Sequence, residues 1–153
     1  MGEQIKQRVE TETEVKAYIQ NMKYALSHGA KLVFQIRRLV DENKQEKYTN
    51  QYTVNTLFGE ENPEKALRRE LQTLTIEEYM RTVKDLRFPN RSEMREFGRI
   101  YNGKENVYIK VRVEVLDQYG NTTAFVMSFH FAERAFTEDM FPYKKDKGGV
   151  AKI

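Results

Sequence analysis

Four side chains suited to acid–base or phosphate chemistry fall at alternating positions of two segments in the second half of the chain. Tyr108 and Lys110 alternate with valine and isoleucine, and Ser128 and His130 alternate with phenylalanine. Histidine can move a proton near neutral pH, and lysine can stabilise a phosphate whose negative charge rises in the transition state. Together these residue types could cleave RNA without a metal ion, with the neighbouring ribose 2′-OH as the nucleophile.

The apolar spacing predicts that both segments are β-strands. Valine or isoleucine occupies every second position from Val107 to Val115, so Tyr108, Lys110 and Arg112 are expected to share the opposite face of the sheet. The next strand alternates in the same way, which would place its serine and histidine on that face as well. In this second strand the residues expected to face the core are Phe125, Met127, Phe129 and Phe131.

Turn residues indicate how the strands connect. Asn102-Gly103 separates the apolar segments 95–101 and 107–115, as in a β-hairpin. Tyr119-Gly120-Asn121 then turns the chain before the last strand. From Met94 onward the sequence therefore predicts an antiparallel β-meander.

The chain before the meander has features typical of helices. Apolar residues recur at helical spacing over 13–27, Asn62-Pro63 is a good helix start, and Thr75–Glu78 matches a capping box. We expect this capping box to begin a short helix that runs through Val83.

Two further segments differ from this helical pattern. Residues 32–36 alternate as a half-buried strand does, and residues 44–59 fit neither period. Helices followed by a meander predict an α+β fold, with N-terminal helices packed on one face of a C-terminal antiparallel sheet. The length suits a single domain over residues 1–143 with an N-terminal helical extension, followed by a disordered basic tail at 144–153.

The composition excludes several classes of protein and of site. The 153 residues include no cysteine, which removes disulfides, cysteine-based zinc sites and thiol catalysis, and two histidines are too few for a histidine-built metal centre. No apolar run approaches the ~18 residues of a membrane-spanning helix, and the N-terminus has no apolar signal region. We therefore expect a cytoplasmic globular protein without a membrane anchor, a metal or another cofactor.

The distribution of charge is more informative than its total of +3. Residues 79–112 contain nine basic and four acidic residues, a local excess of +5. Such a cluster is either a solvated face or a strip that neutralises nucleic-acid phosphates, and composition does not decide between them. A second basic group in the tail consists of Lys144, Lys145, Lys147 and Lys152.

Two blocks in this half of the chain resemble the MqsR family of toxins. The first is Gly103-Lys104-Glu105-Asn106-Val107-Tyr108-Ile109-Lys110-Val111, which is similar to the family's Gly-Lys-Glu-Val-Tyr-Ile-Lys strand. The second is Ser128-Phe129-His130-Phe131-Ala132-Glu133, which is similar to the family's last strand. Upstream, Leu74-Thr75-Ile76-Glu77-Glu78-Tyr79 is similar to its Leu-x-x-Glu-Asp-Tyr helix start, and Met94-Arg95-Glu96-Phe97-Gly98 occupies the place of its Trp-x-x-Phe-Gly segment.

The resemblance implies a RelE-like fold and a toxin that cleaves mRNA and is held inactive by a cognate antitoxin. By position, Tyr108 matches the family's strand tyrosine, Lys110 its strand lysine and His130 the basic residue that ends the last strand. Arg95 and Arg81 fall at or near further polar positions of the family pattern. The expected catalytic residues are therefore His130, Tyr108, Lys110 and Arg95, and the expected RNA-binding residues are Arg81, Arg99 and Arg112.

The chain also departs from the family pattern. Met94 stands in place of the family's tryptophan, and Arg134-Ala135 replaces a His-Pro pair. Three interpretations of the polar sheet face remain open. It is the active surface of a metal-independent endoribonuclease, a non-catalytic surface that binds RNA or a host protein, or an ordinary solvated sheet face.

Overall fold

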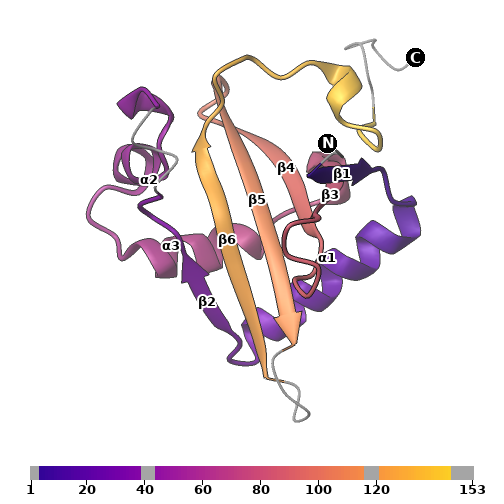
Figure 1. Ribbon diagram of the computed structural model, residues 1–153. Coiled ribbons are helices and arrows are strands. Elements are labelled where there is room, and N and C mark those ends of the chain that lie inside the picture. The colour runs from indigo at the N-terminus through magenta and orange to yellow at the C-terminus, as the bar shows by residue number, and fades with distance from the viewer. Residues whose placement is uncertain (1–3, 39–43, 116–120, 146–153) are drawn as a thin grey trace.

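The computed structural model describes residues 4–38, 44–115 and 121–145 (Figure 1). Within these ranges lie three helices, α1 (Glu12–Ser27), α2 (Asn50–Phe58) and α3 (Pro63–Leu71). Six strands form one sheet: β1 (Ile5–Arg8), β2 (Lys31–Phe34), β3 (Tyr79–Asp85), β4 (Met94–Tyr101), β5 (Glu105–Val115) and β6 (Thr122–Phe131). The strand order is β1-β3-β4-β5-β6-β2, antiparallel except that β2 runs parallel to β6.

The helix starts follow from their capping residues. Thr11 and Glu14 form a capping box at the start of α1, and Asn62 accepts a hydrogen bond from the backbone N–H of Lys65 at the start of α3. The predictions of a helix over 13–27 and of a helix start at Asn62-Pro63 are both confirmed.

The hydrophobic core lies between the helices and one face of the sheet. In Figure 1, α1 and α3 lie behind the strands, and α2 lies beside the edge of β6. The predicted α+β class is therefore confirmed. Across the described ranges, no helix combines the length and the apolar character needed to cross a membrane. The core includes Val15, Ile19, Leu67, Leu71, Phe97, Ile109, Val126 and Phe129.

The hairpin predicted at Asn102-Gly103 is confirmed. Both residues have positive φ, 55° and 74°, and Lys104 N–H donates to the Tyr101 carbonyl at 3.1 Å. This turn fixes the register of β4 against β5. The register places Glu96 opposite Lys110.

The helix predicted from Thr75 through Val83 is wrong. Thr75 and Glu78 do form the expected capping box, but it closes only a single 3₁₀ turn, Ile76–Glu78. The next residues form β3 because they pair on both sides, with β1 and with β4. The β-branched Thr82 and Val83 are buried in this sheet, and pairing with distant strands outweighs the local helix signal.

The predicted inward face of β6 is wrong in its first half. Lys110 pairs with Ser128 and Val111 with Val126, so a β-bulge leaves Met127 without a partner across β5. Phe125 is consequently paired with Arg112 and only half-buried, and Met127 is also half-buried. Beyond the bulge, Ser128 and His130 keep their expected face. The β6 residues that face the core are Ala124, Val126, Phe129 and Phe131.

The strand predicted at residues 32–36 corresponds to β2, whereas the sequence analysis did not predict β1 or α2. Residues 5–8 form edge strand β1 in a part of the chain where we expected a helical extension. Residues 44–59, which fitted neither period, contain a 3₁₀ turn at Glu46–Tyr48 and helix α2.

Helix α2 satisfies the free edge of β6 with side chains. Asn50 donates to the Met127 carbonyl at 3.1 Å and accepts from the Phe129 N–H at 2.9 Å. Thr53 accepts from the Phe131 N–H at 2.8 Å. Since β2 pairs only with the first half of β6, these two side chains supply the second half with the hydrogen bonds that a further strand would form.

Residues 132–145, the C-terminal segment, return from the end of β6 toward β1 and β3 (Figure 1). Phe136 and Phe141 pack against Gly98, where a Cβ atom would lie 2.8 Å from each ring. Tyr143 stacks on Tyr79 with ring centroids 6.1 Å apart. Residues 144 and 145 thus belong to the described fold, and the remainder of the predicted tail, 146–153, lies outside the described residues.

Candidate active site

The sheet face turned away from α1 and α3, which we call the open face, carries polar side chains from neighbouring strands. Strand pairing places Lys110 beside Glu96 and Tyr108 beside His130. The rings of Tyr108 and His130 have centroids 5.3 Å apart. Three of the four predicted catalytic residues therefore lie together.

Glu96 is the centre of this group, although the sequence analysis assigned it no role. Its side chain is only 4% exposed and accepts hydrogen bonds of 2.6 Å from both the Tyr108 hydroxyl and Nε of Arg81. The Lys110 ammonium lies 4.0 Å from Oε2 of the same carboxylate. A buried carboxylate thus holds a phenol and two cations in place.

The surroundings shift the pKa values of these groups. Burial raises the pKa of the Tyr108 phenol, and the charge and hydrogen bond of Glu96 raise it further, so the phenol stays protonated at neutral pH. Burial lowers the pKa of Lys110; Glu96 opposes this effect, and the positive Arg38 and Arg81 add to it. Lys110 consequently gives up its proton more readily than an exposed lysine.

The contacts of His130 assign its tautomer. Nδ1 lies 3.0 Å from the backbone oxygen of Phe131, and Nε2 lies 3.4 Å from Nζ of Lys44. A carbonyl can only accept a hydrogen bond and an ammonium can only donate one. The proton therefore belongs on Nδ1, and Nε2 carries the lone pair that can accept a proton.

Two cations that the sequence analysis missed reach the same face from the segment before α2. Arg38 donates to the Ser128 hydroxyl at 3.1 Å, and Lys44 contacts His130. They arrive there because β2 runs parallel to β6, which brings the chain that follows β2 alongside the second half of β6. No local sequence signal carries that pairing.

A pocket of about 490 Å³ opens beside Tyr108 and His130. Arg81 and Glu96 share its sheet wall, and the C-terminal segment forms the facing wall. The sheet wall alone combines a proton acceptor, a phenol and a guanidinium. The residues of the facing side and rim are Val9, Met80, Ala132, Glu133, Phe136, Asp139 and Met140.

Arg95, predicted to be catalytic, is not part of this group. It lies on the helix-covered face, where it donates to Glu10 at 2.9 Å and stacks on Tyr18 with its guanidinium carbon 4.2 Å from the ring centroid. The alternation of β4 explains this placement. Phe97 faces the core, so Arg95 shares its face and Glu96 lies on the other one.

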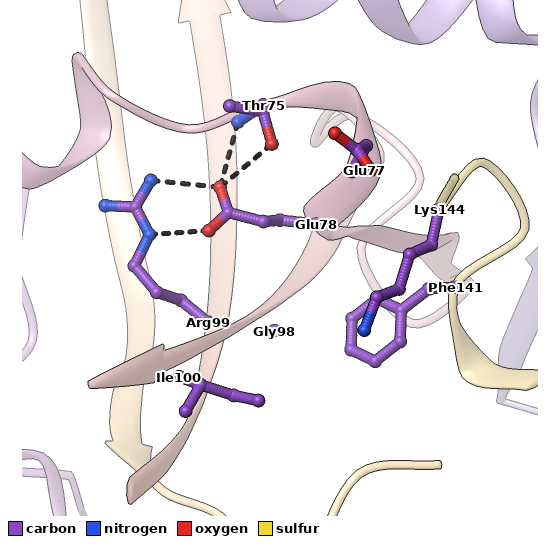
Figure 2. A pocket seen from close by; sticks show the side chains of 8 residues that line it. All are labelled: Thr75, Glu77, Glu78, Gly98, Arg99, Ile100, Phe141 and Lys144. Carbon is purple, nitrogen blue, oxygen red and sulfur yellow. Dashed lines mark hydrogen bonds and ion pairs between the residues drawn. The ribbon is translucent and has the colours of Figure 1, made fainter. Parts of the chain in front are cut away.

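Arg99, predicted to bind RNA, lies on the same helix-covered face as Arg95. Figure 2 shows its guanidinium held by the Glu78 carboxylate, at 2.7 Å from Nε, and it also donates to Thr73. Arg99 also lines a pocket of about 350 Å³. In Figure 2, Phe141 and Lys144 lie across from it. These interactions make Arg99 a structural residue that ties the turn before β3 to β4.

Arg112 lies on the open face but beyond the pocket. The residue is buried, with 8% of its surface exposed, and its guanidinium pairs with Glu114 at 2.5 Å and lies 4.3 Å from the Phe125 ring centroid. Arg81 is therefore the one predicted RNA-binding residue among the pocket's lining residues.

Comparisons with known proteins add no identification. No protein-family model, curated protein or solved structure matches this chain. Among residues 4–38, 44–115 and 121–145, no group of three or more His, Cys, Asp or Glu side chains could hold a metal ion.

Proposed function

We propose that this protein is an endoribonuclease toxin that cleaves mRNA by attack of a ribose 2′-OH on the adjacent phosphodiester, without a metal ion. The observation that carries the proposal is the convergence of His130, Tyr108 and Arg81 on one pocket, with Lys110 next to Tyr108's partner Glu96. Proton-transfer groups and phosphate-binding cations are the groups this reaction needs. The resemblance of residues 63–133 to the MqsR family supports the same function.

In the proposed reaction, Nε2 of His130 takes the 2′-OH proton while the 2′-oxygen forms its bond to phosphorus. The bond between phosphorus and the 5′-oxygen breaks, and the leaving oxygen takes a proton from Lys110, whose lowered pKa favours donation. Arg81 stabilises the charge of the phosphorane, and Tyr108 positions the phosphate. The products are a 2′,3′-cyclic phosphate and a 5′-hydroxyl.

As the toxin of a type II toxin–antitoxin system, the protein would be neutralised by a cognate antitoxin. An adjacent small open reading frame with a DNA-binding motif is the first candidate partner. Coexpression should yield a complex that purifies together and should relieve growth arrest by the toxin. If no neighbouring product binds the protein, the toxin–antitoxin part of the proposal fails while RNA cleavage stays testable.

His130→Ala should lower RNA cleavage by about 10²–10⁴-fold without unfolding the protein. The matched control is His28→Ala, because His28 lies at the end of α1 with its ring stacked on Tyr24 at 3.9 Å. Cleavage of single-stranded RNA in the presence of EDTA and growth arrest on regulated expression in bacteria are the measurements. Equal cleavage by wild type and His130→Ala would contradict the assignment.

A second candidate is a non-catalytic module that binds RNA or a host protein through the same face. The observation that favours it is the pairing of Arg81 and Tyr108 with Glu96, which already satisfies groups that a substrate phosphate would otherwise engage. Salt-dependent RNA affinity without cleavage products would support RNA binding alone. Absence of RNA binding at low salt would favour a protein partner.

A further inference from the structure

The pocket beside Tyr108 has two chemically different walls. The sheet wall carries the polar groups of the proposed reaction, whereas the facing wall is apolar and acidic. The volume of the pocket, about 490 Å³, falls within the range of about 300–1,000 Å³ typical of small-ligand sites. A phosphate alone needs only the sheet wall, so the facing wall calls for a separate explanation.

The facing wall is firmly held against the sheet. Phe136 meets Phe141 edge to face, with centroids 5.5 Å apart, and both rings pack on the bare backbone of Gly98. The Ala132 N–H donates to the Asn106 carbonyl at 2.8 Å, which continues the pairing beyond β6. Because Gly98 is paired with Tyr108, the Phe136 ring is fixed close to the proposed reaction centre.

Apolar side chains are exposed at this pocket. Val9 is 56% exposed and Met140 is 37% exposed, and both line it together with Met80 and Phe136. Such a surface cannot bind a phosphate, but it suits the flat face of a nucleobase. Single-stranded RNA is commonly recognised by stacking unpaired bases on aromatic and apolar side chains.

Two carboxylates complete the facing wall. Glu133 and Asp139, both from the C-terminal segment, are among the residues that line the pocket. A carboxylate repels phosphate but accepts hydrogen bonds from N–H groups of a base. Guanine, adenine and cytosine each carry an exocyclic amino group, whereas uracil has only its N3–H, which lies between two carbonyl oxygens that repel a carboxylate.

From these observations we infer that the C-terminal segment forms a nucleobase-binding subsite next to the reaction centre, which prefers bases with an exocyclic amino group over uracil. The inference deepens the proposed function, on which its placement next to a cleaved phosphate rests. Phe136 and Met140 contact the face of the base, and Glu133 selects its edge. The selectivity would thus come from a part of the chain that follows the last strand.

Binding of nucleoside 3′-monophosphates tests this subsite without any cleavage step. By isothermal titration calorimetry, wild type should bind the guanine, adenine and cytosine nucleotides at least about tenfold more tightly than the uridine nucleotide, as expected for a hydrogen bond to a charged acceptor. Glu133→Gln should abolish this preference, because an amide can donate to the uracil carbonyls. Met140→Ala should weaken the binding of all four nucleotides without changing the order of their affinities.

The matched control is Glu138→Gln, which removes the same charge from the same segment at a residue outside the pocket lining. It should leave the base preference unchanged. Equal binding of all four nucleotides by wild type, or an equal effect of the two glutamate substitutions, would overturn the inference. If the preference is found but RNA is never cleaved, the subsite stands and the proposed endoribonuclease function fails.

Discussion

Two buried glutamates, Glu10 and Glu96, hold arginines on opposite faces of the sheet. Glu10 is 5% exposed and pairs with Arg95 beneath α1, whereas Glu96 pairs with Arg81 at the pocket. Burial raises the pKa of Glu10, but hydrogen bonds from Arg95 and Thr82 outweigh this effect and lower the pKa below its ordinary 4.5. Arg95 therefore contributes to stability, and the proposed chemistry belongs to the other face.

Arg95→Met should lower the free energy of unfolding by about 3–5 kcal/mol, because it removes the hydrogen-bonded cation of the buried Glu10 carboxylate and leaves only the more exposed Arg8, at 3.6 Å. Urea denaturation at pH 7 measures this loss. Lys110→Met is the matched comparison on the open face. Since burial disfavours the charged form of Lys110, that substitution should not destabilise the protein.

The pH dependence of the same Arg95→Met variant provides its control. In wild type, the stability contributed by Glu10 is fully present above pH 4.5 and is lost as pH falls through the lower folded-state pKa. In the variant, burial still raises the pKa of Glu10, but only Thr82 and Arg8 remain to lower it, so this pKa lies above its wild-type position. The gap in stability between the two proteins should therefore shrink as the pH is lowered, and a constant gap would refute the assigned role.

At the scale of the elements, α2 positions the end of β6 that carries His130. Asn50, 1% exposed, contacts three backbone groups through one amide: the carbonyls of Gln35 and Met127 and the N–H of Phe129. Asn50 thus links Gln35, just after the end of β2, to the second half of β6. The site thus depends on a polar side chain in place of strand pairing.

Asn50→Ala should destabilise the protein by about 2–4 kcal/mol, since it leaves several backbone groups of a strand edge unsatisfied. The exposed edge should also promote self-association, which size-exclusion chromatography would detect. Asn55→Ala, at an exposed asparagine of the same helix, is the control and should leave both properties unchanged. Equal stability of the two variants would refute the role given to Asn50.

The elements that the sequence predicts correctly are those defined by local signals. The capping residues of α1 and α3, the Asn102-Gly103 turn and the alternation of β5 are examples. The start of β3 was mistaken for a helix because its capping box is real but serves a single turn. Pairing with the distant strands β1 and β4 makes this segment a strand, and pairing with β6 likewise places β2 parallel to it.

The candidate site was predictable only where local alternation positions its residues. Tyr108, Lys110 and His130 follow from alternation beyond the β6 bulge, and alternation around Phe97 would have placed Glu96 with them and Arg95 apart. The approach of Arg38 and Lys44 depends on contacts with β6 that no local pattern encodes.

For the whole molecule, the excess of +5 over residues 79–112 does not form one phosphate-binding surface. Arg95 and Arg99 turn toward the helices and pair with glutamates, whereas Arg81 lines the pocket and Lys110 lies beside Glu96 on the open face. Arg38 and Lys44, from outside this range, add positive charge to the open face. Cations from distant segments of the chain thus lie together on the open face.

The affinity for single-stranded RNA should depend on salt through these open-face cations. Each phosphate contact contributes about 0.7 to the slope of log affinity against log salt for single strands. Arg38→Ala should reduce the slope by about that amount, measured by fluorescence anisotropy with 2′-O-methyl RNA, which cannot be cleaved. Arg134→Ala, at an exposed residue outside the pocket lining, should leave the slope unchanged; equal slopes for Arg38→Ala and wild type would contradict the prediction.

The packing of Phe136 and Phe141 on Gly98 has a consequence for biosynthesis. Residues 132–145 are translated after all six strands, so the ribosome completes the sheet wall of the pocket before it delivers the facing wall. A chain interrupted before residue 132 would carry Tyr108 and His130 without the surface that we assign to base selection. The order of translation thus makes selectivity the last property the molecule acquires.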